Sequence, residues 1–207
     1  MVASVDEPVG RWVCIDNGSG ADAPGVIHLP ANLGVSASWN LGIKLTIDAP
    51  WWAIVNDDIV FAPGDLAVLA AAMHEQPVIA TLDGFSAFAI NRPALEAVGW
   101  FDENFHPAYV EDCDYEYRAR LARVPIIPLA GGLTHERSST IADARWRKEN
   151  HRTYPRQNDY FRAKWGGGIR GGETLDTPHG RGGSVADWTL DVGRLAELRW
   201  NDGTRSE

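Results

Sequence analysis

The sequence predicts an α/β fold in which helices flank an open, twisted, mainly parallel sheet. Short apolar runs of strand length alternate along the chain with amphipathic segments of helix length, which is typical of βαβ connections. Several of the apolar runs end in glycine or carboxylate residues, as strands do where they leave a sheet. The 207 residues are enough for one domain with a sizeable core.

Three strands and two helices are expected in the first half of the chain. The run at 51–55 is the most strand-like, because it is rich in aromatic and branched side chains. Ser36 is a suitable cap for the first helix, and the apolar residues of the second helix fall on one face. The expected strands are 12–15, 26–29 and 51–55, and the expected helices are 36–46 and 63–74.

The second half continues the alternation and ends in a glycine-rich segment. Acidic residues begin and basic residues end the segment 111–123, as the helix dipole favours, and two prolines make 124–129 an edge strand. The expected strands are 77–80, 86–90 and 124–129, and the expected helices are 92–99, 111–123 and 141–165, the last with a break near Pro155. Residues 166–207 are expected to form a flexible glycine-rich loop and a C-terminal helix that packs on the domain 1–165.

Charge and composition exclude several classes of function. The formal net charge is −9, whereas proteins that bind the phosphate backbone of nucleic acids are usually basic. The two cysteines, Cys14 and Cys113, are too few for a disulfide framework and favour a reducing setting. The sequence has no signal-peptide pattern and no apolar run near the ~20 residues of a membrane span. We therefore expect a cytoplasmic protein that binds no nucleic acid and has no membrane span.

Two adjacent carboxylates, Asp57 and Asp58, follow the strand at 51–55. Adjacent carboxylates repel each other and lose solvation near a core. A divalent cation would remove both costs, because oxygen ligands suit Mg²⁺ or Mn²⁺, and ligands of open α/β sheets bind at the carboxyl ends of strands. The alternative is that both aspartates are turn and cap residues that face water.

Polar residues of other segments could converge on the same edge of the sheet. In a parallel sheet successive strands present their carboxyl ends to one rim, so Asp16 is expected beside Asp57 and Asp58. A carboxylate at the start of the helix 111–123 could act as a general base if it reaches the proton that it removes. The alternatives are first-turn capping for the helix carboxylates and a solvated loop position for the histidine. The residues concerned are Asp16, Glu111, Asp112, Asp114 and His135.

Seven sequence motifs follow one another in an order that resembles a known family. They are VCIDNGS at 13–19, NLG at 32–34 with Asn40, VNDDI at 55–59, GFSAFAI at 84–90, VGWFDENF at 98–105, YVEDCDYEYRA at 109–119, and His135 with SST at 138–140. The chain resembles the family 2 inverting glycosyltransferases with the GT-A fold, including their rhamnosyl- and galactosyltransferase-like branch, over roughly residues 10–140. The resemblance implies a GT-A domain over 1–165.

The resemblance implies a donor side made of the early motifs. Asp16 matches the acid that contacts the base or ribose of a nucleotide-diphosphate sugar. Asp58 falls on the metal-binding position of the DXD-type motif, with Asn56 in place of its first acid, and His135 matches a histidine that approaches the metal or the diphosphate. Mn²⁺ or Mg²⁺ is the implied cofactor. The residues expected to bind the donor are Asp16, Asn17, Asn40, Asn56, Asp57 and Lys164.

The later motifs imply the acceptor side and the reaction. Asp112 matches the general base of the family, which deprotonates the acceptor hydroxyl while a cation neutralises the leaving diphosphate. The expected supporting residues are Glu111, Asp114, Gly84, Phe85 and Trp100. The implied activity moves a sugar from a UDP- or dTDP-sugar to the hydroxyl of a glycan, a small molecule or a protein.

One departure from the family pattern concerns the start of the sheet. Family members begin with a strand and a helix before the motif that contains Asp16, and the residues before Asp16 are too few for that strand. We expect an open sheet edge, which a second subunit could cover in a homo-oligomer.

This departure keeps one alternative function open, a non-catalytic or N-terminally shortened relative that binds a nucleotide or glycan. A nucleotidyltransferase would need an early, basic, glycine-rich phosphate loop, which we do not find. The glycine-rich segment 166–183 is either a lid, with Lys164, Arg170 or Arg181 meeting phosphate charge, or a connector.

Overall fold

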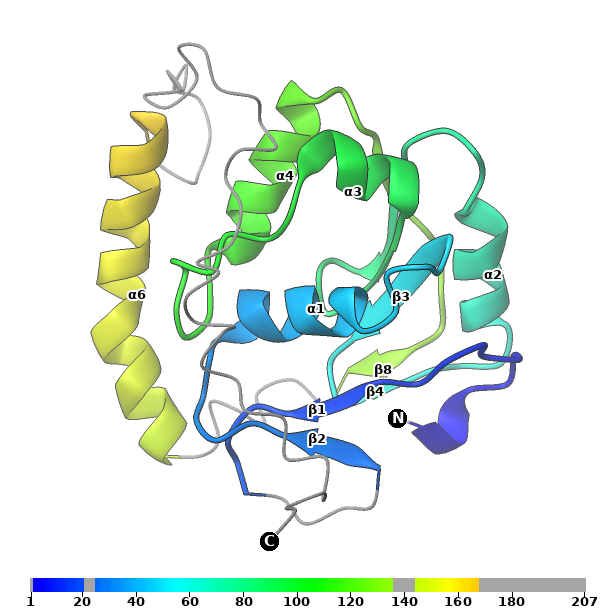
Figure 1. The fold of residues 1–207 in the computed structure, drawn as a ribbon, viewed down its shortest axis with the longest axis horizontal. Helices are drawn as coiled ribbons and strands as arrows, with labels where there is room; N and C mark the ends of the chain where they lie inside the picture. The colour runs from blue at the N-terminus through cyan, green and yellow to red at the C-terminus, as the bar shows by residue number, and fades with distance from the viewer. Residues whose placement is uncertain (1, 21–24, 136–143, 168–207) are drawn as a thin grey trace, which may run out of the picture.

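A computed structural model describes residues 2–20, 25–135 and 144–167 of the chain (Figure 1). The strands are β1 (Cys14–Asp16), β2 (Val26–His28), β3 (Trp51–Val55), β4 (Ile59–Val60), β5 (Ile79–Asp83), β6 (Ala87–Asn91), β7 (Ile126–Pro128) and β8 (Thr134–His135). The helices are η1 (Val2–Ser4), α1 (Val35–Lys44), α2 (Asp65–Ala72), α3 (Arg92–Val98), α4 (Glu111–Leu121) and α6 (Ala144–Trp165). The predicted α/β class with flanking helices is confirmed.

The strand directions are mixed. The four-stranded sheet has the order β3-β6-β5-β7, and its pairs are antiparallel except for β5 with β7. The strands β1 and β2 form a parallel pair, and β4 and β8 an antiparallel pair. Only three residues connect β5 to β6, and a connection that short allows only an antiparallel return. Parallel pairing therefore occurs between β5 and β7 and between β1 and β2, whereas β6 pairs antiparallel with both of its neighbours.

The central strand β6 explains where the core lies. All five of its residues are buried, because helices cover both faces of the sheet. Phe88 and Ile90 point into a cluster shared with α1, α3 and α4, whereas Ala87 and Ala89 point into a second cluster shared with α2 and β4. The sheet thus holds α1, α3 and α4 on one face and α2 on the other.

The long helix α6 packs beside α4 on one flank of the molecule, where Figure 1 shows it in yellow. Phe161 and Trp165 insert into a third cluster with Phe105, Val110 and Tyr117. The helix continues through Pro155, so no break occurs there. No helix among the described residues is long and apolar enough to cross a membrane.

Local conformation at the start of α1 differs from the prediction. The N-cap is Gly34 rather than Ser36, and its φ of 93° is a conformation that favours glycine. A Cβ at this position would lie 3.0 Å from the His106 ring, so the tight passage past residue 106 also requires glycine. Ser36 is fully buried inside the first turn of the helix.

The edge of β3 that faces away from β6 is open. Among the described strands, β3 pairs with β6 alone and β1 pairs with β2 alone. Ala53, in the middle of β3, is exposed although the strand runs beside the core. No described strand pairs with this edge of β3, and its coverage by a second subunit stays a prediction. The predicted loop and helix at 168–207 lie outside the described residues.

Candidate functional site

One end of the four-stranded sheet gathers the polar residues that follow β3. The β3–β6 register places Val55 opposite Ala87, so Asp57 and Asp58 leave β3 beside the connection between β5 and β6. The backbone N–H of Asn56 donates a 2.8 Å hydrogen bond to the carbonyl of Ser86 in that connection. The predicted DXD-type segment is thereby fixed to the loop 84–86.

His135 meets two carboxylates at this end of the sheet. The pairing of β4 with β8 puts His135 opposite Ile59, directly after Asp58. Its Nε2 lies 3.3 Å from Asp58 Oδ1, and its Nδ1 lies 2.6 Å from Asp83 Oδ2. The side chains of Asp58 and His135 are 14% and 16% exposed, so the pair lies at the rim rather than in the core. The structure therefore joins the two residues predicted to bind a metal.

The sequence analysis missed Asp83 as a site residue. It is the last residue of β5, and it lies 52 residues from His135 in the sequence. A carboxylate at the end of a buried strand was the signal that singled out Asp57 and Asp58, and the same signal is present at Asp83. The expected strand 77–80 ends three residues before Asp83, so Asp83 was not expected at a strand end.

The donor set of Asp58 and His135 fits a divalent cation. A carboxylate oxygen and an imidazole nitrogen are both ligands of Mn²⁺, and neighbouring ligand atoms on one ion with bonds of about 2.1 Å lie roughly 3 Å apart. Their separation of 3.3 Å is close to this value. Within the described ranges, no group of three or more His, Cys, Asp or Glu side chains is arranged to hold a metal ion. Further ligands of a cation here would have to come from a bound substrate, from water or from residues outside the described ranges.

The second predicted part of the site, Glu111 and Asp112, begins α4. The two residues before it, Tyr109 and Val110, have φ values of 77° and 75°. This left-handed conformation is strained for a tyrosine and more so for a branched valine, and such strain clusters at functional sites. Asp112 is partly exposed, and its Oδ1 accepts a 2.8 Å hydrogen bond from the N–H of Cys113.

Glu111 differs sharply from its neighbour in its surroundings. Its side chain is 7% exposed, and its Oε2 is buried with no hydrogen-bond partner among the described residues. Burial first, and the charge of Asp112 second, raise the pKa of Glu111 to about 8. At neutral pH Glu111 is therefore mostly protonated, and it adds little repulsion to the negative charge of Asp112.

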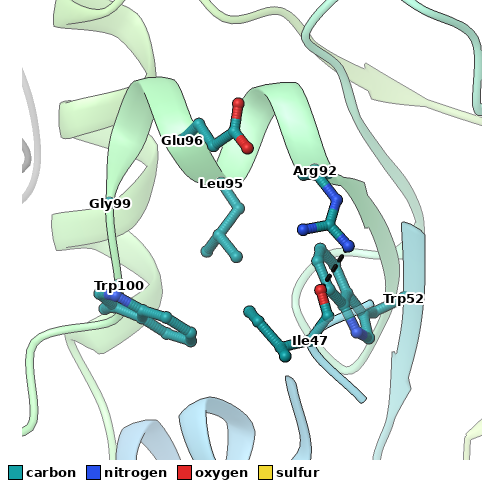
Figure 2. Close-up of a pocket in the computed structure, with 7 residues that line it drawn as sticks. All are labelled: Ile47, Trp52, Arg92, Leu95, Glu96, Gly99 and Trp100. Atoms are coloured by element: carbon teal, nitrogen blue, oxygen red, sulfur yellow. Dashed lines mark hydrogen bonds between the residues drawn. The ribbon is translucent and has the colours of Figure 1, made fainter. Parts of the chain in front are cut away.

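The predicted acceptor residues lie in two different places. Gly84 and Phe85 belong to the loop beside Asp58, but Phe85 is buried in the core, where its ring lies 6.1 Å from that of Tyr115 on α4. Trp100 instead lines a cavity of about 190 Å³ near the start of β3, between α3 and the end of α1 (Figure 2). Trp52 and Arg92 also line this cavity, and both lie at the end of the β3–β6 pair away from Asp58.

Asp16 and Asn17 are committed to turns at the end of β1. The carboxylate of Asp16 accepts hydrogen bonds from the N–H groups of Ser19 and Gly20 and from the Ser19 hydroxyl. Burial raises the pKa of Asp16, but the hydrogen bonds from Ser19, His28 and Gly20 together bring it below its usual value. The side chain of Asn17 bonds to Asn32 and to the N–H of Leu33. A contact of either residue with a nucleotide stays a prediction.

Asn40 is fully buried in this structure, and its contact with a donor stays a prediction. Its side chain is fully buried on α1 and bonds to the carbonyl and the N–H of Phe101 and to Glu103. Asn40 was predicted from its position in a motif, and that position does not distinguish a residue that contacts a ligand from one that forms buried hydrogen bonds between segments. Asn40 fixes α1 to the turn at 101–103.

Lys164 and Asp114 are likewise buried, and their roles in phosphate and acceptor binding stay predictions. The Nζ of Lys164 lies 2.6 Å from Asp102 and 2.7 Å from Asp114. Asp114 also accepts hydrogen bonds from Arg118 and from the indole of Trp165. These contacts join α6 to α4, so both residues serve the packing of the helix that carries Asp112.

Part of the chain is similar to known proteins. The family model described as glycosyl transferase family 2 matches residues 21–118, which include Asp58, Asp83 and Asp112. The chain is similar to a protein named galactofuranosyl glycosyltransferase from Leishmania donovani, with 53% identity in an alignment of 165 residues that covers 45% of this chain. The match spans only 38% of the length of that relative. No solved structure matches the chain.

Proposed function

We propose that the chain, whose residues 21–118 match the model of glycosyl transferase family 2, is an inverting, metal-assisted glycosyltransferase. It moves a sugar from a nucleotide-diphosphate donor to an acceptor hydroxyl. The observation that carries the proposal is the meeting of Asp58 with His135 at the sheet end, 3.3 Å apart.

Each residue of the site has a distinct role in this proposal. Asp58 and His135 would hold Mn²⁺ or Mg²⁺, and the ion would supply positive charge that stabilises the departing diphosphate. Asp112 removes the proton of the acceptor hydroxyl, because its carboxylate is partly exposed at the start of α4. Glu111 stays protonated beside it, so the base keeps its charge without a second anion at its side.

The donor and the setting belong to the proposal as well. The name of the Leishmania relative makes a galactofuranosyl donor the first to test, within the broader expectation of a UDP- or dTDP-sugar. The acceptor is a glycan, a small molecule or a protein. Two free cysteines, Cys14 and Cys113, favour a reducing, cytoplasmic setting.

A ligand panel tests the donor class first. Thermal unfolding is measured with UDP, GDP, dTDP, CDP and ADP, each with and without Mn²⁺. Saturation at 100 times the dissociation constant stabilises a fold by about 2.7 kcal/mol. We expect stabilisation by one diphosphate and only with metal, and no response to any of them would contradict the proposal.

The variant Asp112→Asn then separates catalysis from binding. A general base contributes typically 10²–10⁴-fold to a rate, so we expect turnover to fall by that factor while the diphosphate and Mn²⁺ still stabilise the fold. The alternative function is a non-catalytic relative that binds a nucleotide or glycan. A wild-type chain that binds the diphosphate and shows no transfer would support that alternative.

A further inference from the structure

We propose that Asp83 is a positioning residue for His135, which fixes the ring so that Nε2 presents its lone pair toward Asp58 and toward a cation held between them. This inference rests on the proposed function. It adds a residue at the end of β5 to a site otherwise made from the segment after β3 and from β8.

The contact between Asp83 and His135 determines which ring nitrogen carries a proton. Asp83 Oδ2 lies 2.6 Å from Nδ1, which is a short, charge-assisted hydrogen bond. A carboxylate only accepts, so Nδ1 must carry the hydrogen, and in the neutral ring Nε2 then has the lone pair. Nε2 faces Asp58 Oδ1 at 3.3 Å. Two acceptors that face each other repel unless a proton or a metal cation lies between them.

Asp83 cannot act as a third ligand of the same ion. It contacts Nδ1, whereas Asp58 lies at Nε2, so the imidazole ring separates the two carboxylates. The described part of the chain accordingly contains no group of three such side chains arranged around one metal position. The carboxylate–histidine–metal series is the common arrangement in which the outer carboxylate orients the ligand and raises its basicity.

The backbone around Asp83 is shaped to make this contact. The register between β5 and β6 shifts between Thr81 and Asp83, and such irregularities redirect a side chain at the end of a strand. His135 sits on β8, which has only two residues and pairs with the two residues of β4. Because so short a ladder constrains a side chain weakly, the bond to Asp83 is the main restraint on the ring orientation among the described contacts.

The experiment compares Asp83→Ala, Asp83→Asn and the control Asp48→Ala. Asp48 is an exposed carboxylate before β3, at the end of that strand away from Asp58. Binding of Mn²⁺ is measured by electron paramagnetic resonance with inorganic pyrophosphate as the probe for the diphosphate. The tautomer of the neutral His135 ring is read separately from ¹⁵N chemical shifts in the metal-free protein.

Three results are expected. Loss of an outer partner typically weakens metal binding 10–100-fold, so Asp83→Ala should lose affinity by this factor and shift the ring toward the Nε2–H tautomer. Asp83→Asn, whose amide oxygen still accepts from Nδ1, should keep the tautomer and most of the affinity. Asp48→Ala should match the wild type in both measurements.

The outcomes distinguish this inference from the proposed function. If Asp83→Ala keeps both the Mn²⁺ affinity and the tautomer of the wild type, the positioning role of Asp83 is overturned. If the wild type binds no Mn²⁺ with pyrophosphate, the metal part of the proposed function is wrong, and the tautomer comparison alone decides the role of Asp83. If Asp83→Ala does not fold, the tautomer is measured in Asp83→Asn and in the wild type instead. A wild-type His135 ring that is mainly in the Nε2–H tautomer would contradict the inference.

Discussion

Two groups of charged residues in this molecule use similar side chains for different ends. In the buried group, which joins α6 to α4, two carboxylates (Asp102 and Asp114) meet two cations (Lys164 and Arg118), and the cations bond directly to the carboxylates. In the rim group, Asp58 and Asp83 meet a single histidine. The buried group is balanced in charge, whereas the rim group has an excess of carboxylate.

The difference shows how burial separates structural from functional charge. The buried side chains are at most 6% exposed, so any missing partner would leave a charge without solvent. The rim side chains are 14–26% exposed, and water or a cation can reach them. An acidic excess is tolerable there, and it is the condition in which a cation binds favourably.

Lys164→Met, which removes a cation from the buried group, should have the largest effect on stability. This change leaves Asp102 and Asp114 buried without their shared ammonium group, and loss of one partner of a buried pair costs about 3–5 kcal/mol. Urea unfolding should show a loss of that size. Arg162→Met, an exposed neighbour on α6, should stay within about 0.5 kcal/mol of the wild type. Equal, small effects of the two variants would mean that the buried group does not hold α6.

Asp58→Asn tests the rim group in the opposite sense. Without ligand, the free energy of unfolding should change by less than about 1 kcal/mol, because asparagine has nearly the same shape as aspartate and can stay in the same rotamer. With Mn²⁺ and a diphosphate at 100 times the wild-type dissociation constant, stabilisation should fall from about 2.7 to about 1.4 kcal/mol or less if affinity drops tenfold or more. Asp48→Asn is the matched control. Full ligand stabilisation of Asp58→Asn would remove the rim group from the metal site.

Glu111 differs from both groups, because it is buried like the first group but no cation contributes to its pKa shift. The variant Glu111→Gln tests the effect of this difference on stability. The folded pKa of Glu111, about 8, exceeds the ordinary glutamate pKa of 4.5, so the folded protein binds a proton that the unfolded chain releases between these values. Wild-type stability should therefore fall as the pH rises from about 4.5 to 8.

Glutamine has no proton to lose, so the variant should gain stability over the wild type across that pH range, by roughly 1–3 kcal/mol. Unfolding free energies at pH 5 and pH 8 give the comparison. An equal pH dependence in the two proteins would show that Glu111 is solvated and titrates normally.

The sequence predicted the parts of this structure that depend on local pattern. The strand at 51–55 and the two aspartates after it could be predicted because an apolar run and its polar end are adjacent in the chain. The helix starting at Glu111 could be predicted from its acidic first turn. The antiparallel centre of the sheet could not, because it depends on the three-residue connection between β5 and β6, whereas the expected strand ended at residue 80 and left a longer connection.

Contacts between distant segments explain the remaining differences. Asn40 bonds to residues 61 and 63 positions away, and Lys164 bonds to a carboxylate 62 positions away. Neither a motif position nor a basic residue near a glycine-rich segment reveals such a partner. Asp83 was missed for the same reason, because its partner His135 lies on β8, 52 residues further along the chain.

The attachment of α6 also shows that the segment matched by the family model is shorter than the segment that folds together. The segment matched by the family model, 21–118, contains Asp102 and Asp114 but ends before their lysine. A recombinant fragment cut to that homologous segment would carry two buried acids with no counter-ion from α6. A shortened version intended for expression must therefore extend through Trp165, 47 residues past the match.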